Sequence, residues 1–204
     1  MATSTMFNFN PGVDAPSDGL CDAQYREKTP QAEGNFCSHP RNRTQMASTS
    51  PEYAAAATET DGSTQIRRLE LADHERGFVA LLSQLSSCPD LTPSEFAARF
   101  AELAAHGDDH VILVAEDPSA QERRILATGC LFVERKFLRG GGKVGHVEDV
   151  VVDAAARGKG LGLHIVRRLV EIAKEAGCYK VILDCTPELR AYYAKCGMQD
   201  LLNE

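Results

Sequence analysis

The chain of 204 residues contains no tryptophan, and aromatic residues make up only 6% of it. Its apolar runs are short, and none approaches the roughly 20 residues that a membrane-spanning helix needs. The first ten residues also lack the basic region and apolar core of a signal peptide. We therefore expect no membrane partner and a cytoplasmic location, with targeting to an organelle left open.

The chain also lacks an excess of positive charge, since its formal net charge is −7 at pH 7. A general nucleic-acid-binding protein would need such an excess, so no nucleic-acid partner is expected. The seven cysteines are odd in number and form no CxxC pair, and the six histidines show no metal-ligand spacing. We predict neither a disulfide framework nor a metal site, and we expect the protein to lie in a reducing compartment.

Large aliphatic residues are scarce in residues 1–62, which are rich in Ser, Thr, Pro, Asn and Ala. Such a segment buries too little apolar surface to offset the entropy lost on ordering. The sequence therefore predicts a disordered N-terminal extension over 1–62 and one folded domain over 63–204.

Alternating strand and helix patterns fill the remainder of the chain. Apolar periodicity, the capping box Thr92-Pro93-Ser94-Glu95 and the glycine stops give the expected order β-α-α-β-β-β-α-β-α. The predicted strands cover 64–70, 110–116, 124–137, 146–152 and 178–185, and the predicted helices cover 73–85, 93–105, 160–176 and 187–195. This order indicates a three-layer α/β domain, with a mixed central sheet flanked by helices.

The central strand, 146–152, leads into Arg157-Gly158-Lys159-Gly160-Leu161-Gly162 at the start of a helix. Glycines allow close backbone approach, and the unpaired amides and dipole of a helix N-terminus favour an anion. Neither the P-loop triplet nor the GxGxxG dinucleotide pattern is present. The loop therefore predicts a site for a phosphorylated cofactor, with a solvent-exposed glycine turn as the alternative.

The pattern Arg-x-x-Gly-x-Gly is similar to the pyrophosphate loop of the GNAT superfamily of N-acetyltransferases, which hold acetyl-CoA. Several segments resemble one family within it, the eukaryotic glucosamine 6-phosphate N-acetyltransferases. They are 66–68, 134–136, GHVEDVVVD (145–153), RGKGLG (157–162), GCYKVILDC (177–185) and YAKCG (193–197). The resemblance implies an acetyltransferase fold and a homodimer. It also implies acetyl transfer from acetyl-CoA to the 2-amino group of glucosamine 6-phosphate, in UDP-N-acetylglucosamine biosynthesis.

The resemblance also implies site residues. Val150–Val152 would pair with the pantetheine arm of the cofactor as an added strand. The implied cofactor-binding residues are Val150, Val151, Val152, Arg157, Gly158, Lys159, Gly160, Leu161, Gly162, Leu163, Asp184 and Tyr193. The implied substrate-binding residues are Ser86, Lys136, Arg139, Glu148, Asp149, Val150, Tyr179 and Lys180, some of them reaching the site from the partner of the dimer.

The chemistry needs a proton acceptor for the amine, an N–H donor for the developing oxyanion and a proton for the departing thiolate. Glu148, Asp184 or a main-chain carbonyl near Asp149 would accept the proton. A backbone amide near Val150 would stabilise the oxyanion, and Tyr193 would donate a proton or a hydrogen bond to the sulfur. We therefore name Glu148, Asp184 and Tyr193 as catalytic residues. Each also has a structural interpretation: a salt-bridged strand face, a helix cap and core packing, respectively.

The sequence departs from the family at its C-terminus. No final strand follows Gly197, no late basic residue is found, and Met198 stands where an aromatic residue is usual. We therefore expect the C-terminal strand to be missing, and dimerisation or phosphate binding to be altered. Two other functions stay open: an acetyltransferase acting on another amine, and a weakly active acyl-CoA-binding protein.

Overall fold

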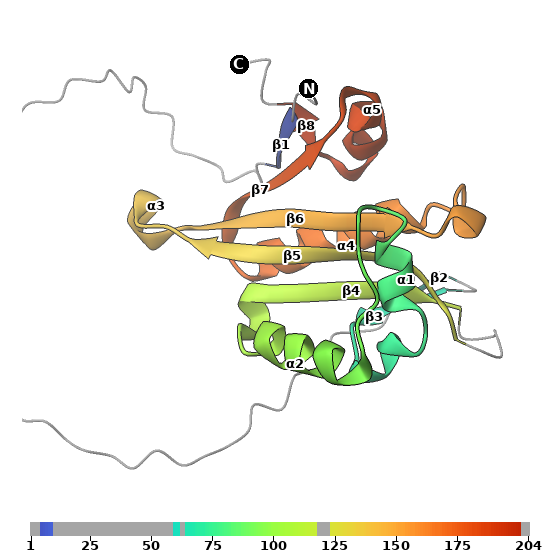
Figure 1. The fold of residues 1–204 in the computed structure, drawn as a ribbon. Coiled ribbons are helices and arrows are strands. Elements are labelled where there is room, and N and C mark those ends of the chain that lie inside the picture. The colour runs from blue at the N-terminus through green and yellow to red at the C-terminus, as the bar shows by residue number, and fades with distance from the viewer. Residues whose placement is uncertain (1–4, 10–58, 62–63, 118–122, 201–204) are drawn as a thin grey trace, which may run out of the picture. The chain divides into compact units, whose positions relative to one another are not determined.

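The computed structural model describes residues 5–9, 59–61, 64–117 and 123–200 (Figure 1). In this part of the chain one sheet has the strand order β2-β3-β4-β5-β6-β7-β1-β8. Its strands are β1 (Thr5–Phe9), β2 (Glu59–Asp61), β3 (Thr64–Arg68), β4 (His110–Glu116), β5 (Ile125–Arg135), β6 (Lys143–Val152), β7 (Cys178–Cys185) and β8 (Gln199–Asp200). β6 and β7 run parallel, and the other neighbouring strands run antiparallel. The predicted mixed sheet is therefore confirmed.

Helices cover both faces of this sheet. They are α1 (Phe78–Leu82), α2 (Pro93–Ala104), the single turn α3 (Leu138–Gly141), α4 (Leu161–Glu175) and α5 (Arg190–Tyr193). In Figure 1, α4 runs behind β5 and β6, whereas α1 and α2 lie on the other side, next to β4. The predicted three-layer α/β architecture is confirmed.

The helix α4 is held by its apolar stripe. Ile165 and Leu169 are fully buried in the core between α4 and the sheet. Burying each of these side chains contributes about 1.5–3 kcal/mol. Gly160 begins the helix with φ +78°, and Gly177 follows its end with φ +80°, a conformation that glycine adopts without steric cost. Packing and glycine caps together fix where the first turn of α4 lies.

A second core lies under α1 and α2, and includes Phe78, Phe96 and Val151. The predicted capping box of α2 is formed, because the Thr92 side chain accepts the Glu95 N–H and the Glu95 side chain accepts the Thr92 N–H. The predicted helix over 73–85 is wrong in extent. Its first part is a 3₁₀ turn over Leu71–His74, and Gly77, with φ +85°, separates that turn from α1.

The predicted disorder over 1–62 does not hold for two segments, because Thr5–Phe9 and Glu59–Asp61 form β1 and β2. β1 pairs antiparallel with β7, and β8 pairs with β1. The β1 sequence, TMFNF, contains two phenylalanines and a β-branched threonine, which suit a strand. Residues 1–4, 10–58 and 62–63 lie outside the described residues, so the expectation of disorder there stays a prediction. At the other end, β8 supplies two strand residues, and 201–204 also lie outside the described part.

The segment predicted as one helix over 187–195 forms three successive short turns. These are a 3₁₀ turn at Pro187–Leu189, then α5, then a 3₁₀ turn at Ala194–Cys196, which Gly197 ends with φ +78°. Both neighbouring tyrosines of α5, Tyr192 and Tyr193, lie on this segment. No helix among the described residues combines the length and apolar character needed to cross a lipid bilayer.

Candidate active site

A β-bulge divides the central strand β6. Thr128 pairs with Val151 and Cys130 pairs with Glu148, so two residues of β6, Asp149 and Val150, stand opposite the single residue Gly129. Asp149 has φ +52°, a left-handed conformation that Asp tolerates better than most residues. A bulge of this kind bends its strand and redirects the neighbouring side chains and amides. The bulge therefore sets the directions of the groups around it.

β6 and β7 part just before this bulge. Their register ends at the pair Val147↔Leu183, so in the described chain the remainder of β6, Glu148–Val152, has no β7 partner. Backbone groups along that edge can pair with an extended ligand in the manner of an added strand. The parting of the two strands therefore provides a slot for a chain-like cofactor arm.

A cavity of about 510 Å³ adjoins this slot. It is lined by Gln84, Leu85, Val150, Val151, Val152, Ala156, Arg157, Gly158, Gly160, Leu161, Gly162, Leu163, Leu189, Tyr192, Tyr193 and Lys195. Most of the predicted cofactor-binding residues are thus brought together. Lys159 and Asp184, which were also predicted to bind the cofactor, are not among the lining residues.

The floor of this cavity suits a diphosphate. Gly158 and Gly160 have φ +83° and +78°, which favours glycine at both positions. Gly160 precedes α4 without a side-chain cap, so the amides of Leu161 and Gly162 at the start of the helix are available to an anion. Arg157 adds positive charge there, and its Nε donates to the Val152 carbonyl at 3.3 Å. Backbone amides, cation and glycines together fit the phosphates of a coenzyme.

Three carboxylates lie at or near the bulge. The pKa of Glu148 is raised, first by partial desolvation of its carboxylate and then by the neighbouring charges of Asp184 and Asp149. A carboxylate with a raised pKa is a stronger proton acceptor than one with an ordinary pKa. The structure thus brings Glu148 and Asp184 close enough to interact, and Glu148 has the electrostatics of a base.

Tyr193 lines the same cavity and is only 7% exposed. Burial, followed by the neighbouring Tyr192, Cys185 and Cys196, raises the pKa of Tyr193 to about 12. A phenol with such a pKa keeps its proton at neutral pH and acts as a hydrogen-bond donor. Its ring meets that of Tyr192 edge to face, with centroids 5.1 Å apart. Both neighbouring tyrosines therefore line the cavity, and each packs against the other.

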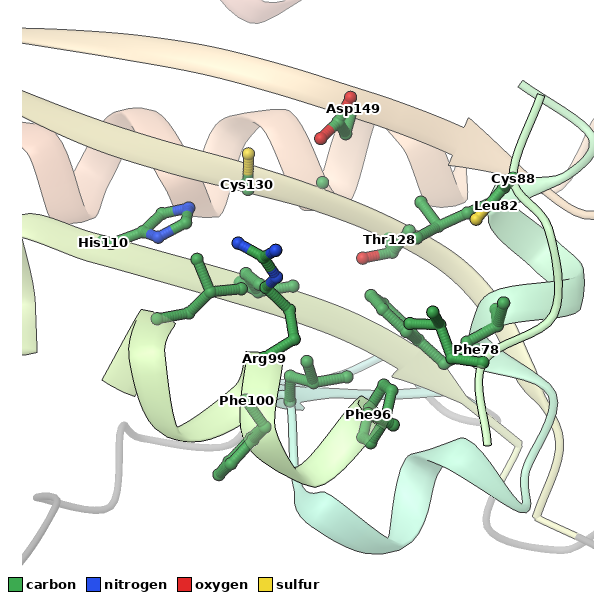
Figure 2. Close-up of a pocket in the computed structure, with 16 residues that line it drawn as sticks. Phe78, Leu82, Cys88, Phe96, Arg99, Phe100, His110, Thr128, Cys130 and Asp149 are labelled. Carbon is green, nitrogen blue, oxygen red and sulfur yellow. The ribbon is translucent and has the colours of Figure 1, made fainter. Parts of the chain in front are cut away.

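A second, largely apolar cavity of about 260 Å³ lies under α1 and α2. Figure 2 shows its phenylalanines on the helix side and Asp149 at the strand side. Asp149 and Gly129 line this cavity, whereas Val150 lines the first one, so the two cavities meet the bulge from different sides. The sequence analysis did not foresee this second cavity, because cavities depend on how helices pack over the sheet.

The cations predicted to hold a sugar phosphate gather elsewhere, around the tip of the β5–β6 hairpin. Lys136 pairs with Glu134 at 2.5 Å. The Arg139 guanidinium lies 4.8 Å from the centre of the Tyr179 ring. These residues line neither cavity, and Lys180 lies on β7 opposite Val144. The predicted substrate-binding residues therefore divide into two groups, because Glu148, Asp149 and Val150 lie at the bulge and the cations lie apart from it.

His146 connects this group to the bulge. Its Nε2 lies 3.1 Å from the Glu134 carboxylate, and the ring lies near enough to Glu148 to oppose the rise in the pKa of that carboxyl. Ser86, the predicted contact in the loop after α1, is exposed and outside both cavity linings, although its neighbours Gln84 and Leu85 line the first.

Asp153 is a site residue that sequence reasoning missed. It is 4% exposed and accepts from the Ala155 N–H at 2.9 Å, from Gln84 Nε2 at 3.1 Å and from Arg124 Nη2 at 2.5 Å. Gln84 in turn accepts the Ala154 N–H at 3.0 Å. This junction ties the end of α1 to the turn before the glycine loop. The only sequence signal was a lone aspartate after three valines.

Comparisons with known proteins point in the same direction. The model of the acetyltransferase (GNAT) family matches residues 64–198. A rice protein, "Probable glucosamine 6-phosphate N-acetyltransferase 2" of Oryza sativa subsp. japonica, is 86% identical over 154 residues, covering 74% of this chain and 93% of the relative. The Arabidopsis thaliana "Glucosamine 6-phosphate N-acetyltransferase" is 49% identical over 136 residues, covering 67% of this chain and 90% of the relative.

Solved structures agree in fold. The crystal structure of glucosamine-6-phosphate N-acetyltransferase from Arabidopsis thaliana matches with a TM-score of 0.65 and 49% identity, covering 67% of this chain and 92% of that one. A Trypanosoma brucei acetyltransferase matches with a TM-score of 0.60 and 37% identity, over 67% of this chain and 92% of that one. The sequence-based expectation of the acetyltransferase fold is confirmed.

Proposed function

The chain belongs to the acetyltransferase (GNAT) family, and from this premise we propose that it acetylates the 2-amino group of glucosamine 6-phosphate with acetyl-CoA. The products are N-acetylglucosamine 6-phosphate and CoA, which suit UDP-N-acetylglucosamine biosynthesis. The observation that carries the proposal is the bulge at Asp149–Val150, where the strand slot, the glycine-floored cavity and Glu148 meet. The names of relatives up to 86% identical support the choice of acceptor.

In this proposal acetyl-CoA supplies an activated acetyl group, and the chain positions it. The free edge of β6, Val150–Val152, pairs with the pantetheine arm. Gly158–Leu163 and Arg157 hold the diphosphate, using the first amides of α4. Lys159 stands outside the cavity lining and contributes charge near the loop rather than a contact.

Glu148 accepts the proton of the attacking amine, because its pKa is raised above the ordinary value of a glutamate. Asp184 contributes mainly by raising that pKa. The N–H of Val150, redirected by the bulge, donates to the carbonyl oxygen as negative charge develops on it. As the new C–N bond forms and the C–S bond breaks, Tyr193 donates a hydrogen bond to the sulfur. The pKa of Tyr193, about 12, exceeds that of a thiol, ~8.5, so full proton transfer from the phenol to the departing thiolate is unfavourable. Tyr193 therefore stabilises the departing sulfur mainly through the hydrogen bond.

We further propose a homodimer working in the reducing cytoplasm. Phe137 is 105% exposed and Leu138 is 70% exposed at the hairpin tip, next to Lys136 and Arg139. Exposed apolar side chains of this size favour a contact with another surface. In a dimer, this tip would bring Lys136, Arg139, Tyr179 and Lys180 near the sugar phosphate of one site or the other. Sedimentation equilibrium measures the oligomeric state directly.

The deciding experiment is release of free CoA from acetyl-CoA in the presence of glucosamine 6-phosphate, glucosamine or spermidine. We expect fast release only with the phosphorylated sugar. Equal or faster release with spermidine would favour an acetyltransferase of another amine. Binding of acetyl-CoA with no release for any acceptor would favour the acyl-CoA-binding protein, and either result would overturn the proposed substrate.

A further inference from the structure

Tyr192 has no assigned role, although its side chain lines the cofactor cavity beside Tyr193. It comes from α5 and reaches the first turn of α4. A Cβ atom built on Gly162 would lie 2.5 Å from the Tyr192 hydroxyl oxygen and 3.6 Å from the ring carbon that carries it. The absence of a side chain at Gly162 therefore leaves the space that the Tyr192 hydroxyl occupies against the helix.

The hydroxyl is also held by the backbone. The N–H of Leu163, in the first turn of α4, lies within hydrogen-bonding reach of the Tyr192 oxygen. A phenol oxygen that accepts a hydrogen bond still has its own proton to donate. Among the described residues, no carboxylate or carbonyl is found to accept that proton. An oriented O–H group with a free proton thus lies at the end of the cavity where the helix amides begin.

We propose that Tyr192 is a further cofactor-binding residue, whose hydroxyl accepts from Leu163 N–H and donates to a diphosphate oxygen of the coenzyme. The proposal rests on the proposed function in taking a coenzyme A derivative as the ligand. It gives the two neighbouring tyrosines different roles. Tyr193 donates a hydrogen bond to the sulfur at one end of the cofactor, and Tyr192 donates one to the phosphates at the other.

The chemistry favours this division. Burial, followed by the nearby Cys196, raises the pKa of Tyr192, so the phenol is neutral at physiological pH and can donate to an anion. Hydrogen bonds from a neutral donor to a charged phosphate are stronger than those between neutral groups. A phenylalanine at this position would keep the ring packing against Tyr193 and lose only the hydrogen bonds.

The test compares two ligands and one conservative substitution. Isothermal titration calorimetry measures binding of CoA, which carries the diphosphate, and of pantetheine, which does not, to the wild type and to Tyr192→Phe. We expect the dissociation constant for CoA to rise about tenfold in the variant, the usual consequence of losing one hydrogen bond to a charged group. Pantetheine binding should be unchanged, so the ligand without phosphates is the internal control.

A second arm uses the contact with Gly162. Gly162→Ala in the wild-type background places a methyl group against the hydroxyl and should displace Tyr192, weakening CoA binding about tenfold. In the Tyr192→Phe background the hydroxyl is gone, so adding Gly162→Ala should change CoA binding less than twofold. The neighbouring Val152 methyl, 3.2 Å from the same Cβ, is present in both backgrounds and cancels.

Three results would overturn the proposal: wild-type affinity for CoA in Tyr192→Phe, an equal loss of CoA and pantetheine binding, or an equal cost of Gly162→Ala in both backgrounds. The proposed function is tested separately. A wild type that binds CoA but does not acetylate glucosamine 6-phosphate would contradict the substrate and leave the binding comparison valid. A wild type that binds no CoA would overturn both.

Discussion

Replacing Asp153 should destabilise the protein and weaken cofactor binding together. The buried carboxylate accepts from the Ala155 N–H, from Gln84 and from Arg124, directly before the glycine loop. Asp153→Ala leaves the first two donors without their acceptor. Each such hydrogen bond contributes about 1 kcal/mol, and the pair with Arg124, whose side chain is 59% exposed, adds no more than about 1 kcal/mol.

The expected loss in the free energy of unfolding is therefore about 3 kcal/mol at pH 7. For a folded part of this size, that corresponds to a decrease of about 10 °C in the melting temperature. Urea titration and calorimetry measure the two quantities. Asp108→Ala is the matched control, because Asp108 also pairs with an arginine, Arg68, but is 82% exposed, and it should cost less than about 1 kcal/mol.

The contribution of the Asp153 carboxylate to stability depends on pH. Burial alone would raise the pKa of Asp153, but Gln84, the Ala155 N–H and the nearby arginines lower it below its ordinary value. A lowered folded-state pKa stabilises the protein above the unfolded value, near ~3.9, and that contribution is lost as the pH falls through the folded value. The stability difference between wild type and Asp153→Asn should therefore be constant from about pH 5 upward and shrink below about pH 4.

The functional consequence concerns the cofactor. Because Gln84 and Asp153 fix the turn before Arg157, Asp153→Asn should raise KM for acetyl-CoA several-fold with a smaller change in kcat. Steady-state kinetics with saturating acceptor separates the two constants. A stability difference that persists unchanged at pH 3, or a loss confined to kcat, would refute the reasoning.

Three further changes test other parts of the structure. Arg67→Met removes the partner of Asp73 and Glu116, both fully buried. Because two buried charges lose their main counter-ion, the free energy of unfolding measured in urea should fall by about 3–5 kcal/mol. A loss below about 1 kcal/mol would contradict this. Glu148→Gln should lower kcat about 10²–10⁴-fold in the CoA-release assay while CoA still binds, and unchanged kcat would exclude Glu148 as the base. Tyr193→Phe should lower kcat about tenfold without changing the affinity for CoA, and wild-type kcat would leave Tyr193 a packing residue.

Local patterns predicted much of the fold. The apolar stripe and flanking glycines of α4, the capping box of α2 and the bounds of β7 all depend on residues close in sequence, and each was confirmed. The helix expected over 73–85 failed because Gly77 adopts a left-handed conformation and because Asp73 is held by Arg67 from another element. The pairing of β1 with β7 could not be foreseen, since composition does not specify a strand partner.

The site was predictable only in outline. Glycines, cations and carboxylates could be assigned to the cofactor end from the sequence and the family resemblance. The contacts of Gln84 with Asp153 and of Tyr192 with Gly162 join residues that are far apart in the chain, and no local pattern reports them. The bulge depends on the register between β5 and β6, which is a property of two strands together.

The extra residue in that bulge also reverses the phase of the strand. Before it, Val147 and Gly145 face α4; after it, Val150 and Val152 do, while Val151 turns to the other core. A strand without the bulge would carry its odd-numbered side chains to one face throughout. Deleting Asp149 would therefore restore a regular strand, in which Val150 alone stands opposite Gly129 and 150–152 keep their present faces, and it would remove the left-handed residue that redirects the Val150 amide. One inserted residue thus allows a single strand to place two adjacent carboxylates, Glu148 and Asp149, at the bulge and still return Val150 and Val152 to the side of α4.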